Sequence, residues 1–165
     1  PDIKGAEDEN IFDPLDVLDG NIPSGKNIIV CGAGLVGCEV SMFLAEEHGK
    51  SVTMIDMLSI VAADMPIYTK WVLDAKLAEL HIDIKLNHEI VEVASNRVKC
   101  INEGKPVEFS GDAVVLALGQ KPQRTLLEAL RRECKDIEII PVGDVNSPRK
   151  ILQAVHEGFH AGRRI

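Results

Sequence analysis

The stretch NIIVCGAGLVGCEV, at residues 27–40, constrains the fold of this chain more than any other feature. It begins with a continuous apolar run, is interrupted by three spaced glycines, and then becomes apolar again. A short unbroken apolar run is typical of a β-strand that is buried on both faces. The second run, within residues 35–49, repeats its apolar positions at helical spacing and stops at Gly49. The stretch therefore predicts a buried strand, a tight turn of bare backbone and a helix.

Strand and helix patterns alternate along the rest of the chain, and this alternation predicts the fold class. The expected strands are 27–31, 51–56, 82–86, 112–119 and 137–144, and the expected helices are 35–49, 66–80, 124–134 and 150–165, with one helical turn at 14–18. Three further short strands within residues 89–110 are separated by turn residues, which predicts an antiparallel meander. We therefore expect an α/β fold, a Rossmann-like doubly wound parallel sheet with right-handed crossovers and an antiparallel three-stranded β-meander insertion.

The helix expected to begin near Pro66 carries two further predictions. Proline is favoured in the first turn of a helix, and Asp64 just before it is the candidate N-cap. The apolar side chains of this helix, Trp71, Leu77 and Leu80, are assigned to the core rather than to a binding site.

Composition limits the kinds of partner and compartment. The 165 residues carry a net charge of −8, which argues against a nucleic-acid partner because phosphate-backbone binding needs a basic surface. No apolar run approaches the roughly 20 residues that span a bilayer, and no signal peptide is visible, so no membrane association is expected. The four cysteines form no C-x-x-C or metal spacing, which favours free thiols in a reducing, cytoplasmic compartment. Because the first residue is not methionine, we interpret the sequence as part of a longer protein.

The glycine turn matches the G-x-G-x-x-G pattern of dinucleotide-binding loops. Its six residues are Gly32, Ala33, Gly34, Leu35, Val36 and Gly37. The first glycine permits a tight turn, the second lets a pyrophosphate approach the backbone, and the third lets the helix pack close to the strand. Free N–H groups and the positive end of the helix dipole suit a phosphate pair. The alternative is a strand–helix turn that needs glycine for packing alone.

An acidic residue at the end of the next strand is the second test of this pattern. Asp56 follows the loop at the expected spacing of about 20 residues, and its carboxylate can accept the hydroxyls of an adenosine ribose. A 2′-phosphate would meet this carboxylate as a like charge, and the stretch beginning at Met57 contains no Arg or Lys to bind it. We assign Asp56 and Met57 to the cofactor site and favour NADH over NADPH.

The residues around the loop resemble a known family, the pyridine nucleotide-disulfide reductase-like flavoprotein oxidoreductases, in which an NAD(P)H domain is inserted into an FAD domain. The segment GAGLVGCE resembles the NAD(P)H-domain form of the loop, and DAVVLALGQKP resembles the strand and loop that close that domain. The C-terminal segment PRKILQAVHEGFHAG is similar to the signature of 2,4-dienoyl-CoA reductases, enoate reductases and related NADH:flavin oxidoreductases.

The resemblance implies further cofactor contacts, outside the glycine loop. It places Glu39 near the nicotinamide end, although an ordinary helix residue is the alternative, and it places residues of the closing loop beside the cofactor. Those loop residues are Ala117, Leu118 and Gly119. In the returning FAD-domain segment, the Gly-Asp pair that bonds the flavin ribityl chain corresponds to Gly143 and Asp144.

The resemblance also implies an organisation and a function. Residues 1–24 form an entering linker, 25–122 the NAD(P)H-binding domain, and 123–165 an incomplete returning segment of an FAD domain. An FAD site of this family needs its own glycine loop, so FAD is expected only in the intact protein. NADH would deliver hydride to a flavin in the flavin-binding domains of the same full-length protein, and the electrons would reduce an enoate or enoyl-CoA there. The alternatives are an NAD(H)-sensing module without turnover, and a loop that holds the ADP half of FAD.

One other motif points to different chemistry. HEGFH, at residues 156–160, matches the H-E-x-x-H pattern of zinc peptidases, with His156 and His160 as ligands and Glu157 as base. No downstream third ligand follows it, and the segment already fits the flavoprotein signature. We therefore expect no metal site. No side chain is a convincing acid, base or nucleophile, so we assign no catalytic residue.

Overall fold

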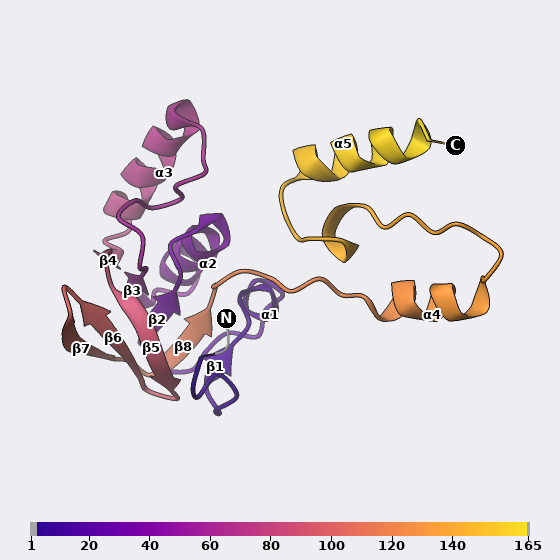
Figure 1. The fold of residues 1–165 in the computed structure, drawn as a ribbon. Helices are drawn as coiled ribbons and strands as arrows, with labels where there is room; N and C mark the ends of the chain where they lie inside the picture. Colours follow the sequence, from indigo (N-terminus) through magenta and orange to yellow (C-terminus); the bar gives the residue numbers. More distant parts are fainter. Residues whose placement is uncertain (1–2, 165) are drawn as a thin grey trace. The chain divides into compact units, whose positions relative to one another are not determined.

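The computed structural model describes residues 3–164, which divide into two compact units. The first unit ends at Leu118 and the second begins at Gly119. The first unit contains, in chain order, β1 (Ile11–Phe12), α1 (Pro14–Leu18), β2 (Asn27–Cys31), α2 (Leu35–Glu46), β3 (Ser51–Ile55), α3 (Ile67–Glu79), β4 (Asp83–Lys85), β5 (Glu89–Ala94), β6 (Arg97–Asn102), β7 (Lys105–Ser110) and β8 (Ala113–Leu116) (Figure 1). The second unit contains α4 (Thr125–Glu133), the 3₁₀ turn η1 (Gly143–Val145) and α5 (Ile151–Gly162).

A five-stranded parallel sheet and a separate three-stranded antiparallel sheet form the first unit, which confirms the predicted α/β class. The parallel sheet has the order β1-β8-β2-β3-β4, and β2 lies at its centre between β8 and β3. The antiparallel sheet has the order β5-β6-β7 and is the predicted meander (Figure 1). No helix of the described chain combines the length and apolar character needed to cross a bilayer.

The central strands are apolar throughout because both faces of the parallel sheet are covered. Successive side chains of a strand point to opposite faces. In β2, Ile28 and Val30 join a core cluster with residues of α1, α2 and α3, whereas Ile29 and Cys31 join a second cluster with the meander. The sheet therefore lies between a helical layer and the meander, and its carboxyl edge is left for the turns that follow β2, β3 and β8.

The N-terminal segment before β2, called the leader here and described from residue 3 to residue 24, belongs to the first unit. Strand β1 pairs in parallel with β8 at the sheet edge, and α1 packs against α2. The predicted helical turn at 14–18 is confirmed, and its N-terminus is capped by Asp13, whose carboxylate accepts the Leu15 N–H at 2.8 Å. Val17 is completely buried in the helical core cluster. The segment expected to be a linker thus contributes a strand, a helix and a core residue.

Helix α3 begins where proline was expected, but two predictions about it are wrong. Its N-cap is Pro66, and no side chain caps it, so Asp64 does not serve as the cap. Trp71 is 75% exposed rather than buried. Leu73 and Leu77 fill the core-facing stripe of this helix, and Trp71 lies off that stripe because two residues correspond to about 200° of helical turn.

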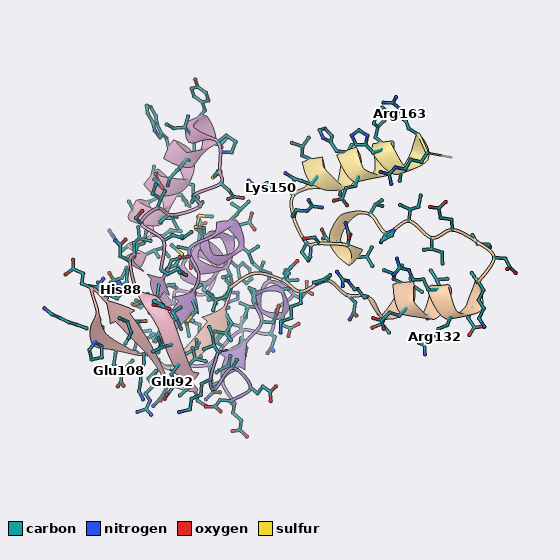
Figure 2. The ribbon with its side chains drawn as sticks, in the orientation of Figure 1. His88, Glu92, Glu108, Arg132, Lys150 and Arg163 are labelled. Carbon is teal, nitrogen blue, oxygen red and sulfur yellow. The ribbon has the colours of Figure 1, made fainter. Side chains whose placement is uncertain are left out.

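His88, just before β5, makes two contacts that hold its ring in place. Its ring packs edge-on against Phe109 of β7, with ring centroids 5.4 Å apart, and its Nδ1 lies 2.6 Å from the Leu86 carbonyl oxygen. Figure 2 shows His88 on the meander, in the same region as Glu92 and Glu108. The side chain therefore helps to hold the start of the meander.

The second unit departs from the sequence prediction at one element. The apolar run at 137–144 forms no strand: Ile137 is exposed, and only Gly143–Val145 is regular, as a 3₁₀ turn. A parallel strand needs hydrogen-bonding neighbours, and the described residues of this unit contain no other strand. The helices predicted at 124–134 and 150–165 are present as α4 and α5.

Candidate dinucleotide site

The three glycines of the turn after β2 meet three different steric requirements. Gly32 has φ of 109°, and a Cβ there would lie 2.3 Å from the Ala117 carbonyl oxygen. A Cβ on Gly37 would lie 2.0 Å from the Gly32 carbonyl oxygen, so the first turn of α2 packs directly on the loop. A Cβ on Gly34 would meet nothing within 4 Å. The outer glycines are needed for packing, whereas Gly34 leaves the backbone open to a ligand.

Open backbone donors lie next to Gly34. Gly34 is the N-cap of α2 and has no side chain to cap it. The N–H groups of Leu35, Val36 and Gly37 have no backbone acceptor among the described residues. Unpaired donors at a helix N-terminus, together with the helix dipole, favour an anion such as a pyrophosphate.

Asp56 bonds to this turn through one carboxylate oxygen and to its own segment through the other. Its Oδ2 accepts the Ala33 N–H at 2.6 Å, and its Oδ1 accepts the Leu58 N–H at 2.8 Å. The Ala33 carbonyl oxygen in turn accepts the Ala62 N–H at 2.7 Å. Each carboxylate oxygen has a second acceptor position, so Asp56 can still bind ribose hydroxyls while it holds the loop. The glycine turn and the segment after β3 therefore form one hydrogen-bonded frame.

A pocket of about 590 Å³ opens over this frame. It brings together seven residues that the sequence assigned to the cofactor: Gly32, Ala33, Gly34, Asp56, Met57, Ala117 and Leu118. The carboxyl ends of β2, β3 and β8 supply these residues, which is where ligands of open α/β sheets bind. The observed geometry fits a dinucleotide, because the pocket brings together unpaired backbone N–H groups that can bind phosphates, a carboxylate and apolar walls.

Other predicted site residues lie elsewhere. Val36 and Gly37 belong to the first turn of α2 and do not line the pocket. Leu35 and Glu39 line a different hollow of about 460 Å³, together with residues of α3. Gly119 begins the second unit. The placement of Glu39 near a nicotinamide stays a prediction.

Six pocket residues were not found from the sequence. They are Ile3, Leu58, Ala63, Asp64, Glu89 and Ile90. Those between 58 and 64 follow Asp56 directly, so their proximity along the chain was a usable signal. The leader and meander residues carry no motif and reach the pocket only because β5 and the leader lie beside the sheet edge.

The predicted flavin-facing pair lies in a hydrogen-bonded turn of the second unit. The Gly143 N–H donates to Glu157 Oε2 at 2.8 Å, and the other oxygen of that carboxylate pairs with the Arg149 guanidinium. Asp144 accepts the Arg149 N–H at 3.4 Å. Lys150 is the N-cap residue before α5, and Arg163 is the C-cap residue after it (Figure 2). Asp144 alone does not make a flavin site.

The same contacts explain the zinc-like motif. Glu157, the candidate base, is engaged by Gly143 and Arg149, while His156 and His160 are exposed. Within residues 3–164, no group of three or more His, Cys, Asp or Glu side chains is placed to share a metal ion. Within the motif, Glu157 holds the Gly143 turn against α5.

The cysteines nearest the pocket are poor nucleophiles. Burial raises the pKa of Cys38 and of Cys100 to about 11, and burial together with the nearby Cys100 raises the pKa of Cys31 further. All four cysteines are free thiols. Because the thiolate is the reactive form, these buried thiols supply no nucleophile at neutral pH.

The fold and this site define a dinucleotide-binding domain, and comparison with known proteins identifies its family. A family model for pyridine nucleotide-disulphide oxidoreductases matches residues 1–148. The chain therefore belongs to the pyridine nucleotide-disulphide oxidoreductase family, and it is the NAD(P)H-binding part of a flavoprotein oxidoreductase.

Individual relatives agree with this family. NADH oxidase of Thermoanaerobacter brockii is 35% identical over 170 residues, which cover 100% of this chain and 26% of the oxidase. Cinnamate reductase of Clostridium sporogenes is 25% identical over 166 residues, which cover 99% of this chain and 24% of that reductase. A solved structure of a 2-naphthoyl-CoA reductase in complex with 2-naphthoyl-CoA matches with a TM-score of 0.86 at 25% identity, covering 100% of this chain and 25% of that one. The chain thus spans about a quarter of the length of these proteins.

Proposed function

We propose that this chain binds NADH, in preference to NADPH, and presents it to a flavin held by other domains of the same protein. One observation carries the proposal. Gly34, whose backbone is open to a ligand, lies in the same turn to which Asp56 is hydrogen-bonded at 2.6 Å. The turn therefore offers N–H donors for a phosphate, and Asp56 offers an acceptor for a ribose hydroxyl. When bound, the reduced nicotinamide supplies the hydride that reduces a flavin.

The charge of the pocket supports the preference for NADH. Its described lining contains three carboxylates, those of Asp56, Asp64 and Glu89, and neither Lys nor Arg. A 2′-phosphate would add negative charge beside Asp56 without gaining a cation. Like charges a few ångströms apart repel each other, and the repulsion is stronger where the pocket excludes water.

The residues of this chain bind and orient the cofactor and take no part in bond making. The backbone of residues 34–37 would hold the pyrophosphate, and Asp56 would hold the adenosine ribose while keeping the turn in place. Leu118, which follows β8, would exclude water from the side of the cofactor. Such a domain contributes to hydride transfer by holding the hydride donor, the reduced nicotinamide, in a fixed position.

We place the electron acceptor in another domain and infer that it is an enoate or an enoyl-CoA. The support is the resemblance of the C-terminal segment to enoate and 2,4-dienoyl-CoA reductases, together with relatives that are named for cinnamate and for 2-naphthoyl-CoA. The four free thiols agree with a reducing, cytoplasmic compartment, which forms part of the same proposal.

Calorimetric titration with NADH and NADPH tests the binding proposal. We expect NADH to bind at least tenfold more tightly, since a tenfold ratio corresponds to about 1.4 kcal/mol of repulsion. Asp56→Asn should lose much of the NADH affinity and should narrow the ratio, whereas Asp64→Asn is the control with the same loss of charge in the same pocket. If neither nucleotide binds at millimolar concentration, or if NADPH binds more tightly, the proposal is wrong.

Because Asp56 also holds the loop, its contact with the ribose needs a separate measurement. ADP and 2′-deoxy-ADP should differ in affinity for the unsubstituted chain and should bind equally to Asp56→Asn. Such non-additivity isolates the pairwise contact between the carboxylate and the hydroxyl. An equal difference in both proteins would show that Asp56 acts on the loop alone.

A further inference from the structure

The leader is attached to the meander by backbone and side-chain contacts. Lys4 forms a parallel β-bridge with Glu92 of β5, and the Val93 N–H donates to the Lys4 carbonyl oxygen at 2.9 Å. Lys4 Nζ lies 3.2 Å from Glu92 Oε2, and Lys99 binds the other carboxylate oxygen at 2.9 Å. Lys99 and then Lys4 lower the pKa of Glu92, so its carboxylate stays charged for both contacts. Glu92 is labelled on the meander in Figure 2.

Gly5 makes this attachment close. Its φ is +88°, and a Cβ at that position would lie 1.9 Å from the Val93 carbonyl oxygen. Only glycine allows both this conformation and this approach. The Asp8 N–H then donates to the Gly5 carbonyl oxygen at 3.1 Å, which turns the chain away from β5.

The attached leader supplies a side chain to the pocket. Ile3 lines it together with Ile90 of β5 and Leu118 after β8, and all three pack against the core cluster on the meander side of the sheet. Gly5 itself does not line the pocket. The position of Ile3 therefore depends on contacts that lie outside the site.

We propose that the docked leader segment Ile3–Ala6 is a wall of the nucleotide pocket and that its docking on β5 sets the affinity for the adenine end of the dinucleotide. This inference rests on the proposed function. The pocket has a polar side, at the α2 N-terminus and Asp56, which suits phosphates and ribose. Its apolar side, at Ile3, Ile90 and Leu118, suits a flat uncharged ring.

Linkage makes the proposal measurable from both directions. If docking of the leader strengthens nucleotide binding, the nucleotide must strengthen docking of the leader by the same factor. The Val93 N–H reports docking directly, because its acceptor is the Lys4 carbonyl oxygen. Adding ADP-ribose should therefore slow hydrogen exchange at the Val93 amide.

The experiment compares three variants of the full chain by calorimetric titration with NADH and ADP-ribose. Gly5→Ala dislodges the leader without changing a pocket residue, and Ile3→Ser removes the apolar wall while keeping the leader backbone. Each should weaken both ligands by about tenfold, the effect of losing part of one apolar side chain's burial. Gly20→Ala is the matched control: it lies in the leader with φ of +106°, but its Cβ would meet nothing within 4 Å.

Several outcomes would overturn the inference and leave the proposed function standing. The affinity of Gly5→Ala for both ligands could lie within twofold of the unsubstituted chain, or Gly20→Ala and Gly5→Ala could lose affinity equally. The rate of hydrogen exchange at the Val93 amide could also stay the same when ADP-ribose is added. If the unsubstituted chain binds neither ligand, the proposed function fails, and this inference fails with it. Thermal unfolding of each variant separates a loss of docking from a loss of fold.

Discussion

The two units of this chain bury their apolar side chains to very different extents. The first unit, in which helices and the meander cover the two faces of a sheet, contains nearly all the buried apolar residues among residues 3–164. In the second, Leu127 is the single buried apolar side chain among the described residues, and α5 has none. Helix α5 exposes a stripe at Ile151, Val155 and Phe159, the spacing of a helix face that normally covers a core.

Because of this difference, the two units can fix the geometry of a binding site to different extents. The Gly32 turn is fixed by close contacts with β8 and α2 and by Asp56, all within a packed unit. The Gly143 turn is held by the Glu157 carboxylate of α5, a helix with no buried residue, and by short-range bonds such as the one from the Arg149 N–H to Asp144. A site of defined shape needs a packed support, so the first unit carries the binding proposal.

Separating the units should break the comparison most visibly. We expect residues 1–118 to unfold cooperatively and to bind NADH within about threefold of the whole chain. Residues 119–165 should show no cooperative transition, because a piece in which Leu127 is the single buried apolar side chain described gains too little from burial to offset the entropy lost on folding. Differential scanning calorimetry and nucleotide titration measure both. A cooperative transition in the shorter piece would show that it folds by itself although α5 leaves its apolar side chains exposed.

A pair of helix glycines gives the next largest effect. Gly37→Ala places a Cβ 2.0 Å from the Gly32 carbonyl oxygen, so it should lower the free energy of unfolding by about 1–3 kcal/mol and NADH affinity at least tenfold. Gly158→Ala, where a Cβ meets nothing within 4 Å, should leave binding unchanged and favour α5 by up to about 1 kcal/mol. Urea unfolding and titration of both variants decide the matter, and equal effects would contradict the difference between the units.

Thiol labelling should sharpen the comparison at the level of local access. Cys134 of the second unit is half-buried, whereas Cys31, Cys38 and Cys100 of the first are buried. A thiol with a pKa of about 11, such as Cys38, is only about one part in a thousand thiolate at pH 8. We expect iodoacetamide to add one group per native chain, at Cys134, and four after unfolding, as counted by mass spectrometry. Rapid labelling of Cys38 in the native chain would indicate that the first unit opens locally.

The smallest effect concerns acid stability of the first unit. Asp112 accepts the N–H groups of Asn27 and Lys26 at 2.8 and 2.7 Å, and these bonds lower the pKa of its carboxyl below the usual value. Because the pKa is lower in the folded state, the stabilisation is present above the unfolded pKa, near 4, and is lost as pH falls through the folded value. Asp112→Asn should therefore lose stability at pH 7 and less at pH 3.

Urea midpoints at these two values of pH test this prediction. Glu108→Gln, a change at an exposed carboxylate of β7, is the control (Figure 2). If Asp112→Asn lowers the midpoint equally at both values of pH, the bonds to Asn27 and Lys26 do not depend on the charge of Asp112.

Local patterns predicted the elements that depend on neighbours in the chain. The strand–turn–helix at 27–46, the meander and the turn at 14–18 all form as expected, because period, capping residues and glycines act over a few residues. The strand predicted at 137–144 is absent because a strand also needs partner strands. The prediction for Trp71 was wrong because an apolar residue in a helix pattern does not reveal which side of the helix faces the core.

Residue types at fixed spacing were enough to predict the parallel sheet, the glycine turn and the acidic partner Asp56. The bond of Asp56 to Ala33, the contact of Glu157 with the Gly143 turn and the position of Ile3 in the pocket arise from the packing of the fold. These contacts join residues far apart in the chain. Their distances depend on how the sheet, meander and helices pack, which no local pattern encodes.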